Sequence, residues 1–394
     1  MTGGWTVRQI TFGTREGRFH AHSYYDIPVW DGAGRRIVGV ETRIKERPPT
    51  PADEVGVGVV DADRPRSWRE VGRSTAWSWQ QGPMAQWVPG RDAVIWNDRA
   101  APGADAFVAR IADPEGRALE VLPRPAYALD PRGRFALSLD MGRLDALRPG
   151  YGYALHSAPA LEPAPGDDGV WRVPLDGGTP ELILPLAEAA SFVRARLPLR
   201  ERLDHRLRPR HYWFNHAKIA PGGARFTVKL RWRRLGHGWN GTMGVSLTCG
   251  TDGSDLRLLS RATSHVIWLG DERLYFWDER AGRLRLMRDA PGGGEAAGGL
   301  PETGIDANVH LRHLPPGTER PEGWVWDTPY REEVRLLHLA SGGVPAEVAR
   351  FGGHVPARGP FRCDLHPCPD ASGRRLALTS LEGGGRQIHV AERA

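Results

Sequence analysis

The sequence predicts an all-β fold, a seven-bladed β-propeller closed by pairing of its N- and C-terminal strands. Three observations support this fold class. A unit of alternating strands recurs seven times along the 394 residues, glycine (49) and proline (33) are abundant as many tight turns require, and each chain end carries a strand without a neighbour of its own. Four short strands in each unit of roughly 40–60 residues is the pattern of propeller blades.

The repeated unit is an alternating strand, a tight turn rich in Pro, Gly or Asp, and a second alternating strand. Its seven copies occupy residues 26–40, 84–96, 126–138, 216–228, 265–277, 310–326 and 366–378. Most copies are followed by a strand pair around a Gly/Asp turn, as in 244–259 and 334–343, where glycine supplies the positive φ of a hairpin. Each copy with its hairpin therefore predicts one blade.

The two terminal strands predict how the ring closes. The last strand, 386–392, has no hairpin partner after it, and the first, 5–12, has no repeated unit before it. Pairing these strands would complete one blade from both ends of the chain and remove two exposed strand edges.

One interval between repeats is longer than the others. Ala126 and His216 begin consecutive units 90 residues apart. We expect a single propeller domain over 1–394 with an insertion at about 141–210, in which the hairpin 169–178 completes blade three and a helix runs from Leu186 to about Leu203. An eighth blade in this interval is the alternative.

Composition narrows the functional class. A formal net charge of +6 and a pI of about 9.5 favour anionic partners, but the arginines are spread along the chain, so no nucleic-acid partner is expected. No apolar run is long enough to span a membrane, and the first residues do not resemble a signal peptide. With three cysteines no disulfide framework is expected, which fits a reducing cytoplasm. We therefore expect a cytoplasmic protein that is not bound to a membrane.

A histidine recurs at one position of the repeat in blades four to seven. His216, His310 and His366 each lie seven residues before a turn glycine, and His265 has Glu272 at that offset. Equivalent positions converge on the propeller axis, so these imidazoles are expected to meet there. Such a cluster can bind a divalent metal or supply a neutral base near pH 7. Alternatively, each histidine only caps its own blade by a hydrogen bond.

Other polar residues flank the same strand ends, where a propeller ordinarily has its binding face. Arg362 and Tyr25 are candidates for holding and deprotonating a uronate. The expected substrate-binding residues are His22, Gln81, Arg124 and Asn215.

Several of these segments resemble the oligogalacturonate lyase family and its TolB-like propeller relatives. The resemblance rests on residues 215–226, Ser264-His265, residues 362–367, residues 79–90 and residues 148–153, and it spans most of the chain. It implies a cytoplasmic enzyme of carbohydrate metabolism that cleaves short uronate oligosaccharides by β-elimination. In that family a histidine abstracts the C5 proton, an arginine assists, and histidines with a glutamine hold a manganese-type ion that neutralises the carboxylate.

Carried over by position, the resemblance implies His265 as the base, with His216 in the same ring able to serve either role. It implies His310 and His366, with His265 beside them, as ligands of a divalent metal such as Mn²⁺. Around His366 the chain departs from the family, because Cys363 and Cys368 stand near the places of the glutamine and the further histidine.

The expected activity is therefore elimination across a 4-linked uronic acid in an acidic oligosaccharide. A non-catalytic propeller that binds a glycan or a protein on the same face is the alternative from another class. A hydrolase would need a pair of carboxylates, for which the sequence offers only Asp26 and Asp364.

Overall fold

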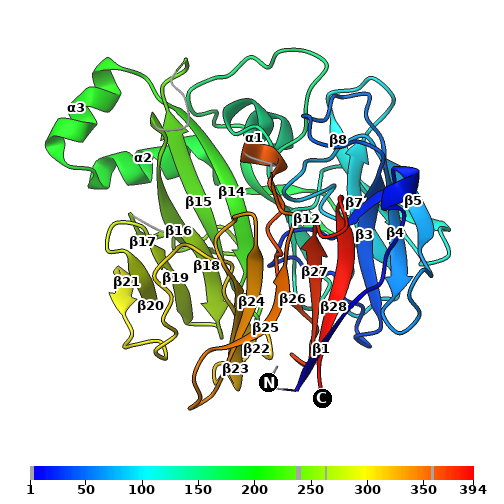
Figure 1. Cartoon of the computed structure of the whole chain (residues 1–394). Coiled ribbons are helices and arrows are strands. Elements are labelled where there is room, and N and C mark those ends of the chain that lie inside the picture. Colours follow the sequence, from blue (N-terminus) through cyan, green and yellow to red (C-terminus); the bar gives the residue numbers. More distant parts are fainter. Residues whose placement is uncertain (1–3, 237–240, 262–263, 356–358) are drawn as a thin grey trace.

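The propeller is seen in a computed structural model that describes residues 4–236, 241–261, 264–355 and 359–394. These residues form seven four-stranded sheets arranged in a ring (Figure 1), which confirms the predicted seven-bladed β-propeller. Because each sheet lies between two others, side chains on both of its faces are buried, and strands such as β4 and β23 are apolar over most of their length.

Blades one to six each follow the order of the chain from the axis outward. The strands of blades one to three are β2 Phe19–Ala21, β3 Arg36–Thr42, β4 Val55–Asp61, β5 Arg69–Ser74, β6 Gln86–Trp87, β7 Val94–Arg99, β8 Phe107–Ala112, β9 Ala118–Leu122, β10 Ala128–Leu129, β11 Phe135–Ser138, β12 Gly169–Pro174 and β13 Glu181–Pro185. Those of blades four to six are β14 His211–Ile219, β15 Arg225–Arg233, β16 Met243–Gly250, β17 Arg257–Ser260, β18 Ser264–Leu269, β19 Arg273–Asp278, β20 Arg283–Ala290, β21 Gly293–Ala296, β22 Arg312–Leu314, β23 Gly323–Asp327, β24 Val334–Ala340 and β25 Ala346–Phe351.

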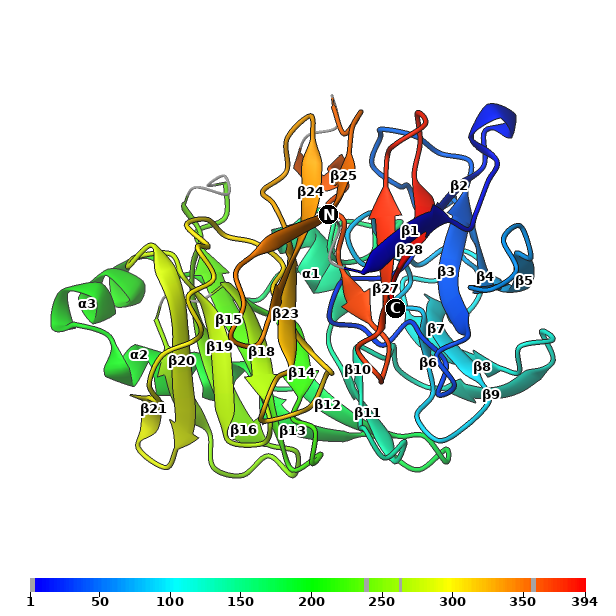
Figure 2. The ribbon, with the colours of Figure 1, turned by 60° about the horizontal axis from the view of Figure 1, so that its bottom comes forward.

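Blade seven joins the two ends of the chain, as the unpartnered terminal strands predict. It consists of β26 Cys368–Pro369, β27 Arg375–Ser380, β28 Gln387–Arg393 and, outermost, β1 Trp5–Gln9. β1 runs antiparallel to β28, with Trp5 opposite Arg393 and Gln9 opposite His389. The blue β1 lies beside the red β28 in Figures 1 and 2. This pairing removes the free edge of β28 and closes the ring.

Tryptophans tie neighbouring blades together. The indole N–H of Trp30 in blade one donates to the carbonyl of Cys368 in blade seven (3.0 Å), and that of Trp268 in blade five donates to the carbonyl of Lys218 in blade four (2.9 Å). Both rings are buried, so each contributes apolar contact while its polar atom is satisfied.

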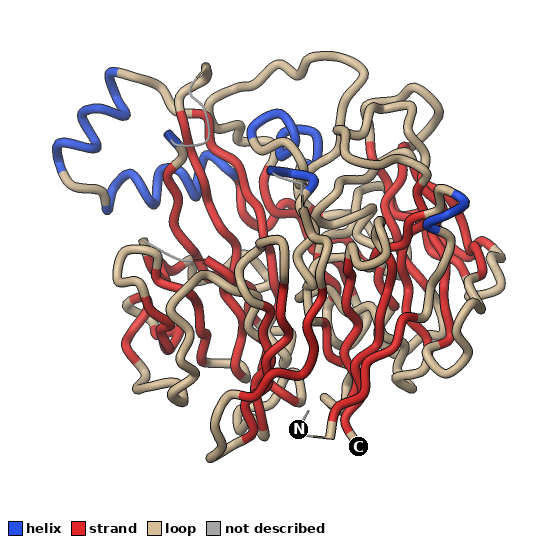
Figure 3. Tube along the Cα trace, in the orientation of Figure 1, coloured by secondary structure: helices blue, strands red, loops and turns tan. Residues whose placement is uncertain are grey.

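The long interval before blade four supplies the outer strands β12 and β13 of blade three. It also supplies three helices, and these helices lie at one end of the propeller in Figure 3. They are α1 Met141–Leu147, α2 Leu186–Arg196 and α3 Leu199–Leu207. The prediction of a single helix from Leu186 to about Leu203 is wrong, because α2 and α3 are separate helices. The helical backbone breaks at Leu197, because a residue before proline is disfavoured in helical backbone, and Pro198 precedes α3.

Two 3₁₀ turns, Thr14–Glu16 and Gly359–Phe361, complete the helical segments that the structure describes. None of the helices in these residue ranges has both the length and the hydrophobicity needed to cross a bilayer.

Candidate active site

Three of the four recurring histidines have left-handed backbone. The φ angles of His216, His265 and His366 are 56°, 53° and 49°, and the strand register of β14 and of β18 shifts at these positions. Met84 repeats the conformation in blade two with a φ of 56°. Such backbone costs a residue other than glycine about 1–3 kcal/mol and is found at functional sites, where a bulge redirects a side chain. The bend thus belongs to several blades, and three of them place an imidazole on it.

The histidines meet near the propeller axis. The ring centroids of His265 and His310 are 4.4 Å apart, and those of His310 and His366 are 4.5 Å apart. His216 joins them through Tyr24, whose ring stacks on it at 5.4 Å and contacts His366 at 4.5 Å. Tyr24 therefore contacts three of the four imidazoles, and His265 joins the group through His310.

A buried group at this centre has the donors that a divalent metal needs. The ligand atoms of His310, Asp364 and His366 lie within 4.8 Å of one another. His310 Nδ1 lies 3.0 and 3.1 Å from the two carboxylate oxygens of Asp327, so Nδ1 donates to Asp327 and Nε2 is the ring nitrogen left for a metal. In the described part of the chain, Nε2 of His310 and Nε2 of His366 have no hydrogen-bond partner.

Charge state differs among the histidines. Burial lowers the pKa of His216, His265 and His366 well below the usual histidine value, so these three rings are neutral at pH 7. Burial acts on His310 in the same direction, but the Asp327 carboxylate outweighs it, and the pKa of His310 is raised.

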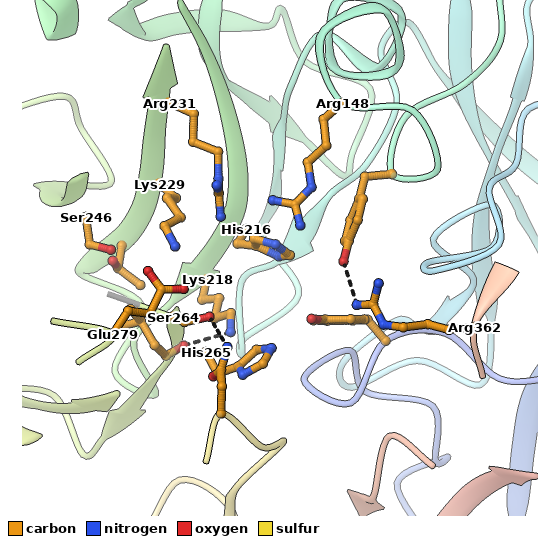
Figure 4. A pocket seen from close by; sticks show the side chains of 15 residues that line it. Arg148, His216, Lys218, Lys229, Arg231, Ser246, Ser264, His265, Glu279 and Arg362 are labelled. Atoms are coloured by element: carbon orange, nitrogen blue, oxygen red, sulfur yellow. Dashed lines mark hydrogen bonds between the residues drawn. The ribbon is translucent and has the colours of Figure 1, made fainter. Parts of the chain in front are cut away.

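A cavity of ≈ 270 Å³ opens beside the histidines, lined largely by blades four and five (Figure 4). His216 and His265 form part of its wall. Its basic side chains are Arg148, Lys218, Lys229, Arg231 and Arg362, whereas its acidic lining among the described residues is Glu279. Lys218 is neutralised by Asp26, with Nζ 2.9 Å from the carboxylate. Arg362 is likewise paired with Asp364, with Nε 2.9 Å from the carboxylate. Basic side chains still outnumber carboxylates in the described lining, which suits an anionic ligand.

Two of the cations of blade four come from one strand. Lys229 and Arg231 are two residues apart on β15, so they lie on the same face of the blade, and Figure 4 shows both directed into the cavity. Burial and the charge of Arg148 lower the pKa of Arg231 to about 9. Burial and the charge of Arg231 lower the pKa of Lys229 well below the usual lysine value. A bound anion would relieve this repulsion.

Of the residues that the sequence singled out, several lie at this centre. His216, His265 and Arg362 line the cavity. Tyr25 is fully buried beneath it, 4.9 Å from His310 between ring centroids. His22 is also buried, and its Nδ1 donates to the carbonyl of Ser23 (2.7 Å).

Three expected substrate-binding residues lie elsewhere. The amide of Gln81 donates to the hydroxyl of Tyr127 (2.8 Å), and Gln81 lines a second cavity, of ≈ 320 Å³, which shares Lys218 with the first. Arg124 stacks on Trp171 at 3.5 Å and is not among the described residues that line the first cavity. Asn215 is fully buried behind His216 and is likewise absent from that described lining.

The sequence reasoning did not single out Arg148, Tyr151, Lys229, Arg231 or Glu279 as site residues. The alternation of basic residues along β15 was the signal that could have identified Lys229 and Arg231. Arg148 and Tyr151 follow α1, within residues 148–153 that carry part of the resemblance, but no periodicity shows that this segment reaches the axis.

The two cysteines near His366 do not belong to the metal-binding group. Cys368 Sγ donates to the carbonyl of Ile27 (3.2 Å), and Cys363 Sγ lies 3.6 Å from the carbonyl of Thr379. The hard oxygen donor in this segment is Asp364 instead.

The fold and the site together define a seven-bladed propeller with a basic cavity next to a buried His/Asp/His group. Among solved structures, an oligogalacturonate lyase in complex with manganese is similar with a TM-score of 0.56 at 12% sequence identity, covering 98% of this chain and 93% of that one. An oligogalacturonate lyase from Vibrio parahaemolyticus has a TM-score of 0.54 at 10% identity, with coverages of 98% and 93%. This likeness establishes a shared fold. No family model matches the chain, and the comparison with curated proteins found no match.

Proposed function

We propose that this protein is a lyase that cleaves an acidic, uronate-containing oligosaccharide by β-elimination. The observation that carries the proposal is the basic cavity, in which neutral imidazoles lie beside a buried group suited to a divalent cation. Elimination removes the proton α to a carboxylate, so it requires a base together with positive charge that stabilises the carbanionic intermediate. The shared fold of the two oligogalacturonate lyases supports this substrate class.

In this proposal Arg362 and Arg148 hold the substrate carboxylate, and His265 removes the C5 proton. His265 is suited to be the base because it lines the cavity, is neutral at pH 7, and has no hydrogen-bond partner for Nδ1 among the described residues. The electrons of the C5–H bond form the C4–C5 double bond, and the C4–O4 bond breaks. His216 lies on the same wall and can position the sugar ring.

The residues present fit a manganese-type ion. Two unpartnered imidazole nitrogens and a carboxylate are ligands that Mn²⁺ accepts, and Asp327 orients one imidazole from behind, as carboxylates commonly do at metal sites. His310, Asp364 and His366 would hold the ion, whereas His265 packs against His310 outside this group. When bound, a divalent ion would neutralise the substrate carboxylate and acidify the C5 proton.

The test is incubation with oligogalacturonate, glucuronan and other uronate oligomers, followed by the ultraviolet absorbance of the unsaturated product. We expect absorbance to rise with at least one substrate. The rate of this rise should fall after chelation. His265→Ala should lower the rate by about 10²–10⁴-fold, whereas His156→Ala, a control at an exposed position, should not. No product from any uronate, with or without manganese, would overturn the proposal; oligosaccharide binding without turnover would favour a non-catalytic propeller.

A further inference from the structure

Tyr151 lines the cavity, and the proposed function gives it no role so far. Its ring lies 5.6 Å from His216 and 6.4 Å from Tyr24 between centroids, and its hydroxyl accepts a hydrogen bond from Arg362 (3.3 Å). The guanidinium of Arg148 lies over the same ring, 3.9 Å from its centroid. Tyr151 therefore presents a hydroxyl to the cavity while two arginines contact it from different segments of the chain.

The segment that carries Tyr151 is anchored to α1. The amide of Tyr153 donates to the carbonyl of Met141 (3.0 Å). A Cβ on Gly152 would lie 2.1 Å from that carbonyl oxygen, so only glycine allows the chain to return this closely to the helix. Arg143 in turn ties α1 to blade four by donating to the carbonyl of Tyr212 (2.7 Å). Tyr151 is thus held in place by a rigid support.

β-Elimination has a second requirement besides the base. The oxygen that leaves C4 belongs to a sugar hydroxyl, which is a poor leaving group unless it receives a proton as the bond breaks. Arg362, whose pKa is raised, holds its protons too tightly to serve efficiently, and Lys218 is held by Asp26. A neutral donor with a pKa near the working pH is needed.

We propose that Tyr151 is the general acid of this reaction and donates its phenolic proton to the leaving O4. The inference rests on the proposed lyase function. His265 takes the C5 proton, the C5–H electrons form the C4–C5 double bond, the C4–O4 electron pair leaves with oxygen, and that oxygen takes the proton of Tyr151. The phenolate regains a proton from solvent, and His265 returns its proton to solvent before the next turnover.

The electrostatic surroundings favour this role. The titratable and charged groups that face Tyr151 among the described residues are Arg148 from its own loop, Arg362 and Asp364 from the segment before β26, Tyr24 from blade one, His216 from β14 and Arg231 from β15. Burial raises the pKa of Tyr151, but the charges of Arg148 and Arg362 outweigh it and lower the pKa to about 8. The phenol is therefore mostly protonated at neutral pH, and the same arginines stabilise the phenolate that donation leaves behind.

The decisive experiment compares leaving groups. Tyr151→Phe keeps the ring between Arg148 and His216 and removes only the hydroxyl. The kcat/KM of this variant and of the wild type is measured on an oligouronide and on a uronide with a 4-nitrophenyl group at O4, which departs without protonation. We expect a loss of about 10²–10⁴-fold on the oligouronide and less than about tenfold on the aryl substrate. We also expect the fall of wild-type kcat/KM as pH rises through about 8 to disappear in the variant.

Two controls separate this role from others. Tyr330→Phe removes a hydroxyl that donates to the carbonyl of His354, outside the described cavity lining, and should change neither rate. His265→Ala should lower both rates, since both substrates need the base. Thermal unfolding and oligouronide binding of Tyr151→Phe are measured alongside, to show that the variant is folded.

The outcomes distinguish the two proposals. If the wild type is active and Tyr151→Phe loses kcat/KM equally on both substrates, or on neither, the general-acid role of Tyr151 is overturned and the lyase function stands. A wild type that cleaves neither substrate overturns the lyase function and the general acid with it. A pH limb near 8 that persists in Tyr151→Phe would also contradict the inference.

Discussion

The left-handed backbone of His216 makes a prediction about stability that is independent of the chemistry. With a φ of 56°, this position favours glycine over every other residue. Replacing His216 by Ala keeps the left-handed strain, which is about 1–2 kcal/mol for an L-residue. Replacing it by Gly removes that strain, but the greater conformational entropy of glycine in the unfolded chain destabilises the folded state by about 0.5–1 kcal/mol. His216→Gly should therefore be more stable than His216→Ala by about 0.5–1 kcal/mol.

His310 provides the matched control, because it occupies the same position in blade six without a positive φ. There the order should reverse, with His310→Ala more stable than His310→Gly by about 0.5–1 kcal/mol. Each pair loses the same imidazole, so lost contacts cancel within it. Urea unfolding of the four variants measures the differences, provided that the slope with denaturant is unchanged. The same Gly–Ala difference at both positions would refute the idea that the backbone is strained at His216.

Three other predictions concern the site and the ring. Asp327→Asn should weaken manganese binding by about 10–100-fold in calorimetry, and unchanged affinity would exclude the orienting role of Asp327. Asp327→Ala should also lower the free energy of unfolding by about 2–4 kcal/mol, because the backbone amides of His310 and His366 lose their acceptor. Arg231→Met should raise KM for an acidic oligosaccharide about tenfold and weaken its salt dependence in steady-state kinetics, and an unaltered KM would place the anion elsewhere. Deleting residues 1–9 removes β1 and leaves β28 as a free edge, so sedimentation should show self-association and the melting temperature should fall; a monomer of unchanged melting temperature would contradict this account of closure.

The sequence was sufficient to predict the ring and the histidines because both depend on local signals. Alternation, turn glycines and prolines act over a few residues, so a sevenfold repeat can be recognised without tertiary information. The recurrence of His216, His310 and His366 at a constant offset from turn glycines predicted equivalent places in different blades. Ring symmetry then implied that these places converge, and the contacts of His310 with His265 and His366 agree with this.

The same reasoning could not identify the other walls of the cavity. Gln81 and Arg124 flank strand ends much as Arg362 does, yet Gln81 lines a different cavity and Arg124 packs on a tryptophan of blade three. Tyr151 sits in the long interval that interrupts the repeat, where no periodicity predicts a position. Its place depends on the docking of α1 against β14.

The sequence by itself therefore determined the number of blades, the closure of the ring and the presence of a histidine centre. Only the tertiary structure decided that Asp364 joins His310 and His366, and that Arg148, Tyr151, Lys229 and Arg231 share one cavity. The physical reason is the range of the interactions. Turns and alternating strands are specified by neighbouring residues, whereas the site is assembled from segments as distant as Tyr24 and Arg362, which meet only once the ring has closed.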